Sequence, residues 1–421
     1  METKTADVRK MSVRHEKVQN LMYLVNEQNL MVAHKTQPKG KAMGVDKVCK
    51  EAYDENAAEN IASLVKRLKQ FSYRPLPVRR TYIPKANGKM RPLGIPSYED
   101  RIVQSVMADL LNSVYEPRFL DCSYGFRPKR SAHDVVRQID SEIGHKPVNW
   151  ILEADIKSFF DNLDHEWLMK FLEHDIEDKN FLRYIRRFLT AGVMEGTELE
   201  PSDKGSVQGG LISPVCANVY LHYVLDLWFT KAIAPRLKGY SKYIRYADDF
   251  IILFQYKHDA DRVFEVLGKR LGKFGLEVAE DKTRIIPFGK YYGTKESFDF
   301  LGFTFLNAKS RKGCYRVAII TSKKKLKAKR LAVKQWLRQR MTMNAKETLI
   351  ILNRKLIGHY NYYGISGNIE KLNSFYFYVC KATFKMFNRR SQRKSVNWEK
   401  FLLLWRKFIT KPHITCNIWY A

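Results

Sequence analysis

The stretch Lys242-Tyr-Ile-Arg-Tyr-Ala-Asp-Asp-Phe-Ile-Ile-Leu-Phe254 places two adjacent carboxylates, Asp248 and Asp249, between two runs of apolar, strand-forming residues. This pattern predicts a β-hairpin with both acids at its tip. Adjacent carboxylates repel each other, so a turn that carries both is favoured by a bound cation. An isolated Asp-Asp pair is nevertheless most often a solvated turn, and its meaning depends on what the rest of the chain brings to the same place.

A second apolar segment delivers a third carboxylate. Val148-Asn-Trp-Ile-Leu-Glu-Ala-Asp-Ile156 predicts a strand with Asp155 near its end. On its own, that acid is compatible with a capped strand end. Together with the hairpin tip it supplies the oxygen ligands that Mg²⁺ prefers. Two such ions, about 3.5–4 Å apart, bind both the attacking and the leaving oxygen of a phosphoryl transfer. The three acids therefore point to a nucleic-acid polymerase.

The charge of the chain points to a polyanionic partner. The 421 residues include 74 Lys and Arg against 44 Asp and Glu, a net charge of +30. Residues 306–421 hold 27 Lys and Arg and three acidic residues, a net charge of +24. Phosphates neutralise such a charge with release of counterions, and interleaved aromatics suit RNA or single strands. For Tyr360, Tyr376 and Trp405 we expect core positions instead.

Several classes of protein are excluded by composition. With 45% hydrophobic residues the chain can bury cores, and its length allows two or three domains. It has no apolar run of about 18 residues and no lipidation signal, so we expect no membrane association. The six cysteines form no C-x-x-C pair, and the N-terminus has no apolar signal core. We therefore expect a cytoplasmic, nucleic-acid-associated protein with free thiols.

Local patterns predict the elements around the acids. Apolar spacing predicts amphipathic helices through Val18, Leu21, Met22 and Val25 and through Ile61, Leu64, Val65 and Leu68. Residues 75–84 and 90–96 flank Asn87-Gly88, which predicts a hairpin edged with cations. From Ser322 to Leu337 the pattern predicts a basic helix that packs on a core with one side and faces a phosphate backbone with the other; a merely solvated basic face is the alternative.

Several motifs, in a fixed order, resemble those of reverse transcriptases. Tyr246-Ala-Asp-Asp249 is similar to their catalytic box, Asp155-Ile-Lys-Ser-Phe-Phe-Asp161 to their first aspartate motif, and Ser206-Val-Gln-Gly-Gly-Leu-Ile-Ser-Pro214 to their Gln-Gly motif. Other segments resemble the group II intron reverse transcriptases, or maturases, in particular: Ile83-Pro-Lys85, Arg91-Pro-Leu-Gly-Ile-Pro96, Ser123-Tyr-Gly-Phe-Arg-Pro128, Phe300-Leu-Gly-Phe303 and Asn388-Arg-Arg-Ser-Gln-Arg-Lys-Ser395. One departure is Val207, where that family usually has proline.

This resemblance implies an α+β right-hand polymerase with fingers, an antiparallel palm sheet and a helical thumb. The expected division is an N-terminal extension over residues 1–70, fingers and palm over 71–305, a maturase X-like thumb over 306–385 and a basic nucleic-acid-binding segment over 386–421. The implied activity is RNA-directed DNA synthesis from deoxynucleoside triphosphates on an RNA template and a DNA primer. The implied cofactor is a pair of Mg²⁺ ions, with Mn²⁺ as the alternative. A group II intron RNA, whose splicing and retrohoming the protein assists, is the further partner.

The resemblance also assigns roles to individual residues. Asp155, Asp248 and Asp249, with the backbone carbonyl of Ile156, would hold the metal ions, and Lys282 would protonate the leaving pyrophosphate. The incoming nucleotide would contact Lys85, Arg91, Phe160, Gln208 and Gly209, with Phe160 excluding a 2′-hydroxyl. The primer grip would consist of Phe300, Leu301 and Gly302. Nucleic acid would also contact the basic residues Lys323, Lys324, Lys325, Lys327, Arg389, Arg390, Arg393 and Lys394.

Plainer roles stay open for some of these residues. Phe160 is compatible with an ordinary core position, Lys85 and Arg91 with contacts to template phosphates, and Lys282 with a solvated loop. For His133 we expect a structural role, because two-metal chemistry needs no histidine.

Two other functions stay open as well. One is an RNA-binding splicing cofactor with incidental polymerase activity, and the other is a reverse transcriptase co-opted for defence or for generating diversity. The family commonly carries an endonuclease module with paired cysteines and histidines after the basic region. This sequence reaches Ala421 without one, so we expect a primer made by another agent.

Overall fold

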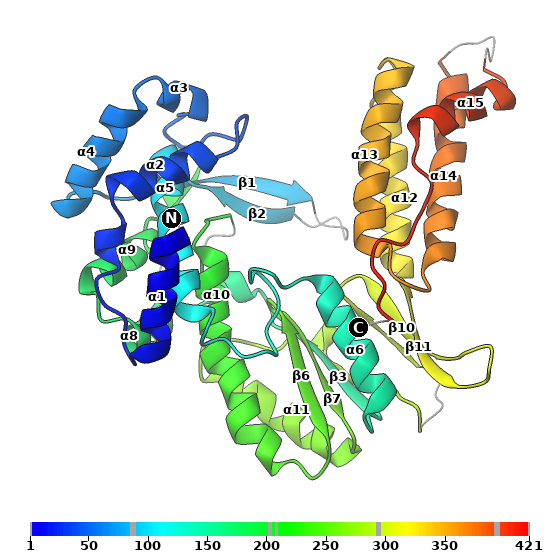
Figure 1. Cartoon of the computed structure of the whole chain (residues 1–421), viewed down its shortest axis with the longest axis horizontal. Coiled ribbons are helices and arrows are strands. Elements are labelled where there is room, and N and C mark those ends of the chain that lie inside the picture. Colours follow the sequence, from blue (N-terminus) through cyan, green and yellow to red (C-terminus); the bar gives the residue numbers. More distant parts are fainter. Residues whose placement is uncertain are drawn as a thin grey trace.

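The chain forms three parts, and the middle part is built on a central β-sheet (Figure 1). The computed structural model describes residues 2–84, 90–200, 204–206, 209–291, 296–390 and 396–419. In the view of Figure 1, N-terminal helices and the β1–β2 hairpin lie on the left, the central sheet lies below, and C-terminal helices stand on the right. This mixture of helices and antiparallel sheets agrees with the α+β class expected from the sequence.

The N-terminal part is mainly helical, and its core is built from apolar helix faces. In the predicted helix of residues 61–68, now α4, the side chains of Ile61, Leu64 and Leu68 are buried as expected. The helices of this part are α1 (Glu2–Arg14), α2 (Glu27–Thr36), α3 (Lys50–Asp54), α4 (Ala57–Lys69), α5 (Tyr98–Tyr115), α8 (His165–Asp175) and α9 (Lys179–Leu189).

The helix expected through Val18 and Val25 does not form, and that prediction was wrong. Asn20 adopts a left-handed backbone conformation (φ 57°), which an α-helix does not accommodate. The backbone of Val18 instead pairs with Ile176, and the Met22 amide donates to the Asp178 carboxylate over 2.8 Å. Val18, Leu21 and Val25 are buried as the spacing suggested and Met22 is half-buried, but they lie in an extended segment with one short 3₁₀ turn at Met22–Leu24.

The expected cationic hairpin is confirmed and belongs to a larger sheet. Strands β1 (Val78–Pro84) and β2 (Met90–Ile95) pair antiparallel, while Asn87-Gly88 lies outside the described residues. Strand β1 also pairs in parallel with β4 (Val193–Glu195), which forms a hairpin with β5 (Glu198–Glu200).

The central sheet carries the acids and separates two hydrophobic cores. It consists of β6 (Ser241–Tyr246), β7 (Asp249–Phe254), β3 (Trp150–Asp155) and β8 (Arg284–Pro287), in that order and antiparallel throughout. Along β7, Phe250 and Ile252 belong to the core shared with the N-terminal helices, α10 (Ser213–Leu221) and α11 (Lys257–Gly272). Ile251 and Leu253 belong to the second core, with α6 (Ala132–His145). The alternation explains why these strands are apolar on both faces.

The C-terminal part adds a three-stranded sheet and four long helices to the second core. The predicted basic helix is confirmed as α12, with Val333 and Leu337 buried. The elements of this part are β9 (Ser297–Phe300), β10 (Phe303–Lys309), β11 (Tyr315–Thr321), α12 (Lys323–Arg338), α13 (Ala345–Tyr363), α14 (Ile369–Asn388) and α15 (Trp398–Phe408). Of the expected domain boundaries, that after residue 305 falls inside β10 and that after residue 385 falls inside α14. Across the described ranges, every helix is too short or too polar to span a lipid bilayer.

Candidate active site

The three acids predicted from the sequence meet at one edge of the central sheet. Asp249 begins β7 and lies directly opposite Asp155, the last residue of β3. Cross-strand neighbours of this kind have Cα atoms about 4.5–5.5 Å apart. Asp248 occupies the turn between β6 and β7, as the hairpin pattern predicted. Two strands and one turn thus bring together carboxylates from residues far apart in the chain.

Mutual repulsion and loss of hydration raise the pKa values of two of these acids. The pKa of Asp249 is raised to about 7, first by loss of hydration and then by the negative charges of Asp155 and Asp248. Asp249 keeps an exposed face, but the surrounding protein displaces much of its hydration shell. Burial is also the main cause that raises the pKa of Asp248, followed by the charge of Asp155. Both shifts mark a site where carboxylates are crowded together and partly dehydrated.

Lys282 lies within the site and forms an ion pair with Asp155. Its ammonium donates to the Asp155 carboxylate, and this hydrogen bond raises the pKa of Lys282. Lys282 ends a short 3₁₀ turn (η5, Glu280–Lys282), whose preceding residue, Ala279, donates its amide to the Asp155 carbonyl over 2.9 Å. The lysine is therefore held beside the acids and is not simply a solvated loop residue.

The donor set fits hard divalent cations, although the site is open. Within the described residues, no three His, Cys, Asp or Glu side chains are gathered closely enough to enclose a metal ion. The acids offer oxygen ligands only, and the raised pKa values of Asp248 and Asp249 are what a dication would reverse. The buried Ile156, which pairs with Val278, follows Asp155 in the chain, and its carbonyl as a ligand stays a prediction.

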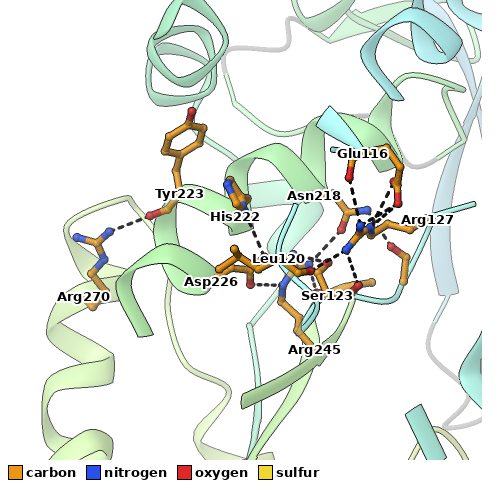
Figure 2. Close-up of polar contacts among 12 residues, drawn as sticks. Glu116, Leu120, Ser123, Arg127, Asn218, His222, Tyr223, Asp226, Arg245 and Arg270 are labelled. Atoms are coloured by element: carbon orange, nitrogen blue, oxygen red, sulfur yellow. Dashed lines mark hydrogen bonds and ion pairs between the residues drawn. The ribbon is translucent and has the colours of Figure 1, made fainter. Parts of the chain in front are cut away.

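A buried arginine, Arg245, holds the turn that carries Asp248, and sequence reasoning did not single it out. Figure 2 shows this arginine with Asp226, Asn218 and Ser123. Arg245 is fully buried and donates from Nη1 to the carbonyl oxygen of Ala247 over 3.0 Å. Ala247 is a left-handed residue (φ 56°) immediately before Asp248. A non-glycine residue is strained in this conformation, so the turn needs support from its surroundings.

Asp226 is the counterion of this arginine. Its carboxylate accepts two hydrogen bonds from Arg245, at 2.7 and 2.6 Å, and neither side chain is exposed. Burial alone would raise the pKa of Asp226, but the guanidinium lowers it below its ordinary value. Asp226 ends a π-helical segment, His222–Asp226, that continues α10. An arginine within an apolar strand was the available signal, since a buried guanidinium needs a partner.

Two further segments connect the arginine to the turn. Ser123 Oγ accepts from Arg245 Nη2 over 2.8 Å, and Asn218 Oδ1 accepts from Nη1 over 3.1 Å. Asn218 also donates to the carbonyl of Gly125, and a side chain at Gly125 would place its Cβ 2.4 Å from the Ala247 amide nitrogen. The Ser-Tyr-Gly-Phe-Arg-Pro segment thus packs directly against the turn.

The β1–β2 hairpin approaches the acids from the N-terminal side, and Gly209 packs against this hairpin. Arg91 on β2 is exposed, and its positive charge acts on Asp248, so it faces the site as predicted. Gly209 (φ 122°) lies so close to β2 that a Cβ there would be 2.4 Å from the Gly94 carbonyl oxygen. Lys85 and Gln208 lie outside the described residues, and their roles stay predictions.

Phe160 lies in the short helix that follows Asp155 in the chain. It belongs to α7 (Phe159–Asn162), where Phe159 is buried and Phe160 is half-buried, with ring centroids 5.4 Å apart. The Phe160 carbonyl accepts from the Ser206 amide over 2.7 Å, at the start of the Gln-Gly loop. Its position near Asp155 is compatible with both the gate and the core interpretation.

The predicted primer grip is a tight turn beside Asp249. Leu301 (φ 50°) and Gly302 (φ 81°) connect β9 to β10, whereas Phe300 is buried in the core. Tyr362 on α13 donates its hydroxyl to the Leu301 carbonyl over 2.8 Å. Leu301, Gly302, Asp249 and Lys325 line one cavity of about 600 Å³. The structure therefore brings the turn, the acids and α12 together.

The predicted basic contacts divide into exposed and internal residues. Lys323, Lys324, Lys325 and Lys327 are exposed on α12, and Arg389 is exposed directly after the end of α14. Arg390 is half-buried, with Nη2 3.4 Å from both the Arg340 carbonyl and the Thr348 hydroxyl, so its contacts are within the protein. Arg393 and Lys394 lie outside the described residues.

The expected structural residues have internal contacts. His133 Nε2 lies 2.7 Å from the Tyr362 carbonyl oxygen and links α6 to α13. Tyr360, Tyr376 and Trp405 are buried as expected, and the Trp405 indole donates to the Tyr376 hydroxyl over 2.7 Å.

Comparison with known proteins assigns the family. Residues 83–305, which include all three acids, match the reverse transcriptase (RNA-dependent DNA polymerase) family. The chain belongs to the reverse transcriptases. The resemblance seen in the sequence is confirmed, and with it the right-hand polymerase fold and RNA-directed DNA polymerase activity, which depends on divalent metal ions.

Curated relatives place this reverse transcriptase among intron-encoded proteins. The group II intron-encoded protein LtrA of Lactococcus lactis subsp. cremoris is 29% identical over 463 residues, covering 90% of this chain and 76% of the relative. Protein YkfC of Escherichia coli K12 is 34% identical over 304 residues, covering 65% of this chain and 78% of the relative. Nuclear intron maturase 1 of Arabidopsis thaliana is 32% identical over 94 residues, covering 22% of this chain and 13% of that protein.

Proposed function

We propose that this reverse transcriptase is the RNA-directed DNA polymerase of a group II intron. It extends a DNA primer on an RNA template and binds its intron RNA to assist splicing and retrohoming. The observation that carries the proposal is the convergence of Asp155, Asp248 and Asp249 at the sheet edge, beside the turn of residues 300–302. The similarity to LtrA over 90% of the chain supports the intron class.

In this proposal, Asp155, Asp248 and Asp249 hold two Mg²⁺ ions, with the carbonyl of Ile156 as a further ligand and Mn²⁺ as an alternative metal. The chemistry that the bound ions supply is activation of the primer 3′-hydroxyl and neutralisation of charge on the triphosphate and pyrophosphate. The protein contributes position: the sheet fixes Asp155 and Asp249, and Arg245 holds the turn of Asp248. Positioning and charge stabilisation account for most of the rate in phosphoryl transfer.

Lys282 is the proton donor in this scheme. Its ammonium lies beside the acids, where it pairs with Asp155. From this side of the site it would give its Nζ proton to the leaving pyrophosphate.

Other residues bind and select the nucleotide. Arg91, with Lys85, grips the triphosphate, which an arginine does bidentately. Gln208 and Gly209 pack against the nascent base pair, where the close approach of Gly209 to Gly94 brings this loop against the β2 strand. Phe160 lies under the sugar and rejects a 2′-hydroxyl.

The primer and the RNA are held from the C-terminal side. Leu301 and Gly302 grip the primer, with Phe300 supporting the turn from the core. The exposed lysines of α12, together with Arg389, Arg390, Arg393 and Lys394, contact nucleic acid; Arg390 does so only through its remaining exposed surface. We place the protein with its RNA in the cytoplasm, and we keep the four-part division of the chain as a proposal.

A primer-extension assay on an RNA template with Mg²⁺ tests the function. Deoxynucleotide incorporation should be robust for the unchanged protein and undetectable for Asp248→Asn. Asp261→Asn, which removes a half-exposed carboxylate from α11, is the matched control and should retain activity. Ribonucleotide incorporation alone, or equal activity of the Asp248 variant, would contradict the assignment.

The same variant separates polymerase from splicing. If Asp248→Asn still promotes splicing of the intron RNA encoded around its gene, the two roles use different surfaces. Failure of the unchanged protein to bind or splice that RNA would remove the intron part of the proposal and leave the polymerase part intact.

A further inference from the structure

A cavity lies between α12 and α14, at the end of α12 remote from the acids. Its volume is about 380 Å³, within the size range of small-ligand sites. Lys325, near the start of α12, lines the cavity of the active site, whereas Arg338, at its end, lines this one. Thirteen residues of α-helix separate them by about 20 Å. The cavity is therefore distinct from the proposed primer site.

Positive charge surrounds the cavity without compensation. Five cationic residues line it, namely Lys334, Arg338, Lys381, Lys385 and Arg389, and none of the described residues that line it is acidic. Within the part of the chain that the structure describes, none of the five forms a salt bridge. Like charges held around one concave space attract an anion.

The floor of the same cavity is apolar. Leu337 and Met386 are nearly fully buried there, and Met341 and the Tyr378 ring stand at its edge. The guanidinium of Arg330 lies 5.2 Å from the centre of the Tyr378 ring, on which it stacks. A phosphate alone would not use the apolar floor, and a purely apolar ligand would not use the five cationic residues. The lining therefore fits a ligand that has both a negatively charged part and an apolar part.

We propose that this cavity receives a single unpaired nucleotide of bound RNA. The base enters between Tyr378, Leu337 and Met341, and the five cations hold the adjoining phosphates. Bases that are splayed out of an RNA fold are commonly recognised by an aromatic side chain together with basic groups. The inference rests on the proposed RNA binding and deepens it, because it assigns a defined site that distinguishes unpaired from paired RNA.

Binding of two RNA hairpins to the full chain tests the proposal. One hairpin carries a single bulged 2-aminopurine nucleotide, and the other is fully paired. Fluorescence and affinity are measured with EDTA and without nucleotides, so the readout is independent of polymerase activity. The bulged hairpin should bind about tenfold more tightly than the paired one, with a change in 2-aminopurine fluorescence. Equal affinities would overturn the proposal.

Two substitutions change the cavity and leave its five cationic residues in place. Ala382→Phe fills the space, and Met341→Asp adds a charge to the edge at a residue that is already 37% exposed and so tolerates the change. Both should lower the affinity for the bulged hairpin to that for the paired one, in proteins whose melting temperatures match the unchanged chain. Wild-type preference for the bulge in Met341→Asp would overturn the proposal even if Ala382→Phe fails to fold.

A charge-matched pair tests the cationic rim. Lys381→Ala with Lys385→Ala should weaken both hairpins, and more than Lys400→Ala with Lys407→Ala, which removes two exposed lysines from α15. Equal weakening by the two pairs would overturn the role of the rim. Displacement of the bulged hairpin by a polyglutamate peptide at a lower concentration than by unlabelled bulged RNA would show an acidic protein as the occupant and would also overturn the proposal.

Discussion

At the residue scale, the position of Asp248 depends on Arg245. The guanidinium donates to the Ala247 carbonyl, to Ser123 and to Asn218, and its charge is balanced by the fully buried Asp226. A buried ion pair adds little net stability compared with apolar residues of the same size, but removal of one partner leaves an unpaired charge. The role of this buried pair is therefore to position the turn that carries Asp248.

A substitution series separates stability from positioning. Arg245→Met or Asp226→Leu alone should lower the free energy of unfolding by about 3–5 kcal/mol. The double variant should regain most of that stability, yet its kcat for primer extension should stay about a hundredfold low, with KM for deoxynucleotides nearly unchanged. Urea unfolding and steady-state kinetics measure the two effects. Recovery of both stability and kcat in the double variant would contradict positioning by this pair.

His359 gives the fold a dependence on acid pH. It is 5% exposed, lies 4.3 Å from the Phe375 ring and 4.8 Å from the Tyr363 ring, and neither ring nitrogen has a hydrogen-bond partner among the described residues. Burial lowers the pKa of His359 to about 4, from about 6.5 when unfolded. The unfolded chain therefore binds the proton first, so stability is full above about pH 6.5 and falls as pH decreases toward 4.

The corresponding variant is His359→Phe. It should raise the melting temperature at pH 5 and flatten the decline between about pH 6.5 and 4, worth roughly 1–3 kcal/mol. Thermal melts across this pH range, with His413→Phe as the control at an exposed histidine, measure the effect. An unchanged pH profile in His359→Phe would show that another group causes the decline.

At the element scale, the active site is assembled by close backbone approach between separate segments. The Gln-Gly loop touches β2 at Gly209, and the segment around Gly125 touches the catalytic turn. Each contact requires the absence of a side chain, and Gly209 also has a φ of 122°, which other residues rarely adopt. These glycines fix where the nucleotide side of the site lies relative to the acids.

Gly209→Ala should therefore separate the loop from β2. We expect KM for deoxynucleotides to rise and kcat to fall, because the added Cβ would lie 2.4 Å from the Gly94 carbonyl oxygen. Gly268→Ala on α11, where the added Cβ meets nothing within 4 Å, is the control and should raise stability by about 0.5–1 kcal/mol. Wild-type kinetics in Gly209→Ala would show that the loop does not need this contact.

Elements were predictable from the sequence where one local pattern determined them. The hairpin of Asp248, the strand of Asp155 and the basic helix α12 each follow from a run of residues with one period. The segment from Val18 to Val25 has helical spacing, but tertiary pairing with Ile176 and the left-handed Asn20 prevail. The Arg245 network joins three separate segments, and no local pattern shows such contacts.

At the scale of the whole molecule, the excess of positive charge is the dominant property. It is concentrated in residues 306–421, where the α12 lysines are exposed. RNA binding that depends on phosphate neutralisation weakens as salt is added. In a plot of log affinity against log salt concentration, each phosphate contact to a single strand contributes a slope of about −0.7.

Affinity for a single-stranded RNA, measured by fluorescence anisotropy from low to moderate salt, should fall steeply. Lys323→Ala with Lys324→Ala should reduce the slope by about 0.7 for each lysine that contacts a phosphate. Lys257→Ala, on α11 and already paired with Asp261, should leave it unchanged. A flat salt response of the unchanged protein would contradict the role of the basic part.

The central sheet has consequences for how this polymerase could be rebuilt. Strands β3 and β7, which carry Asp155 and Asp249, present apolar side chains to both hydrophobic cores and separate the two. Deleting the C-terminal helices and their sheet would open to water the second core, which Ile151, Ile251 and Leu253 share with α6. The C-terminal part therefore cannot simply be exchanged for that of another polymerase. In a chimaera, the new C-terminal part would need side chains that pack against the apolar face of β3 and β7.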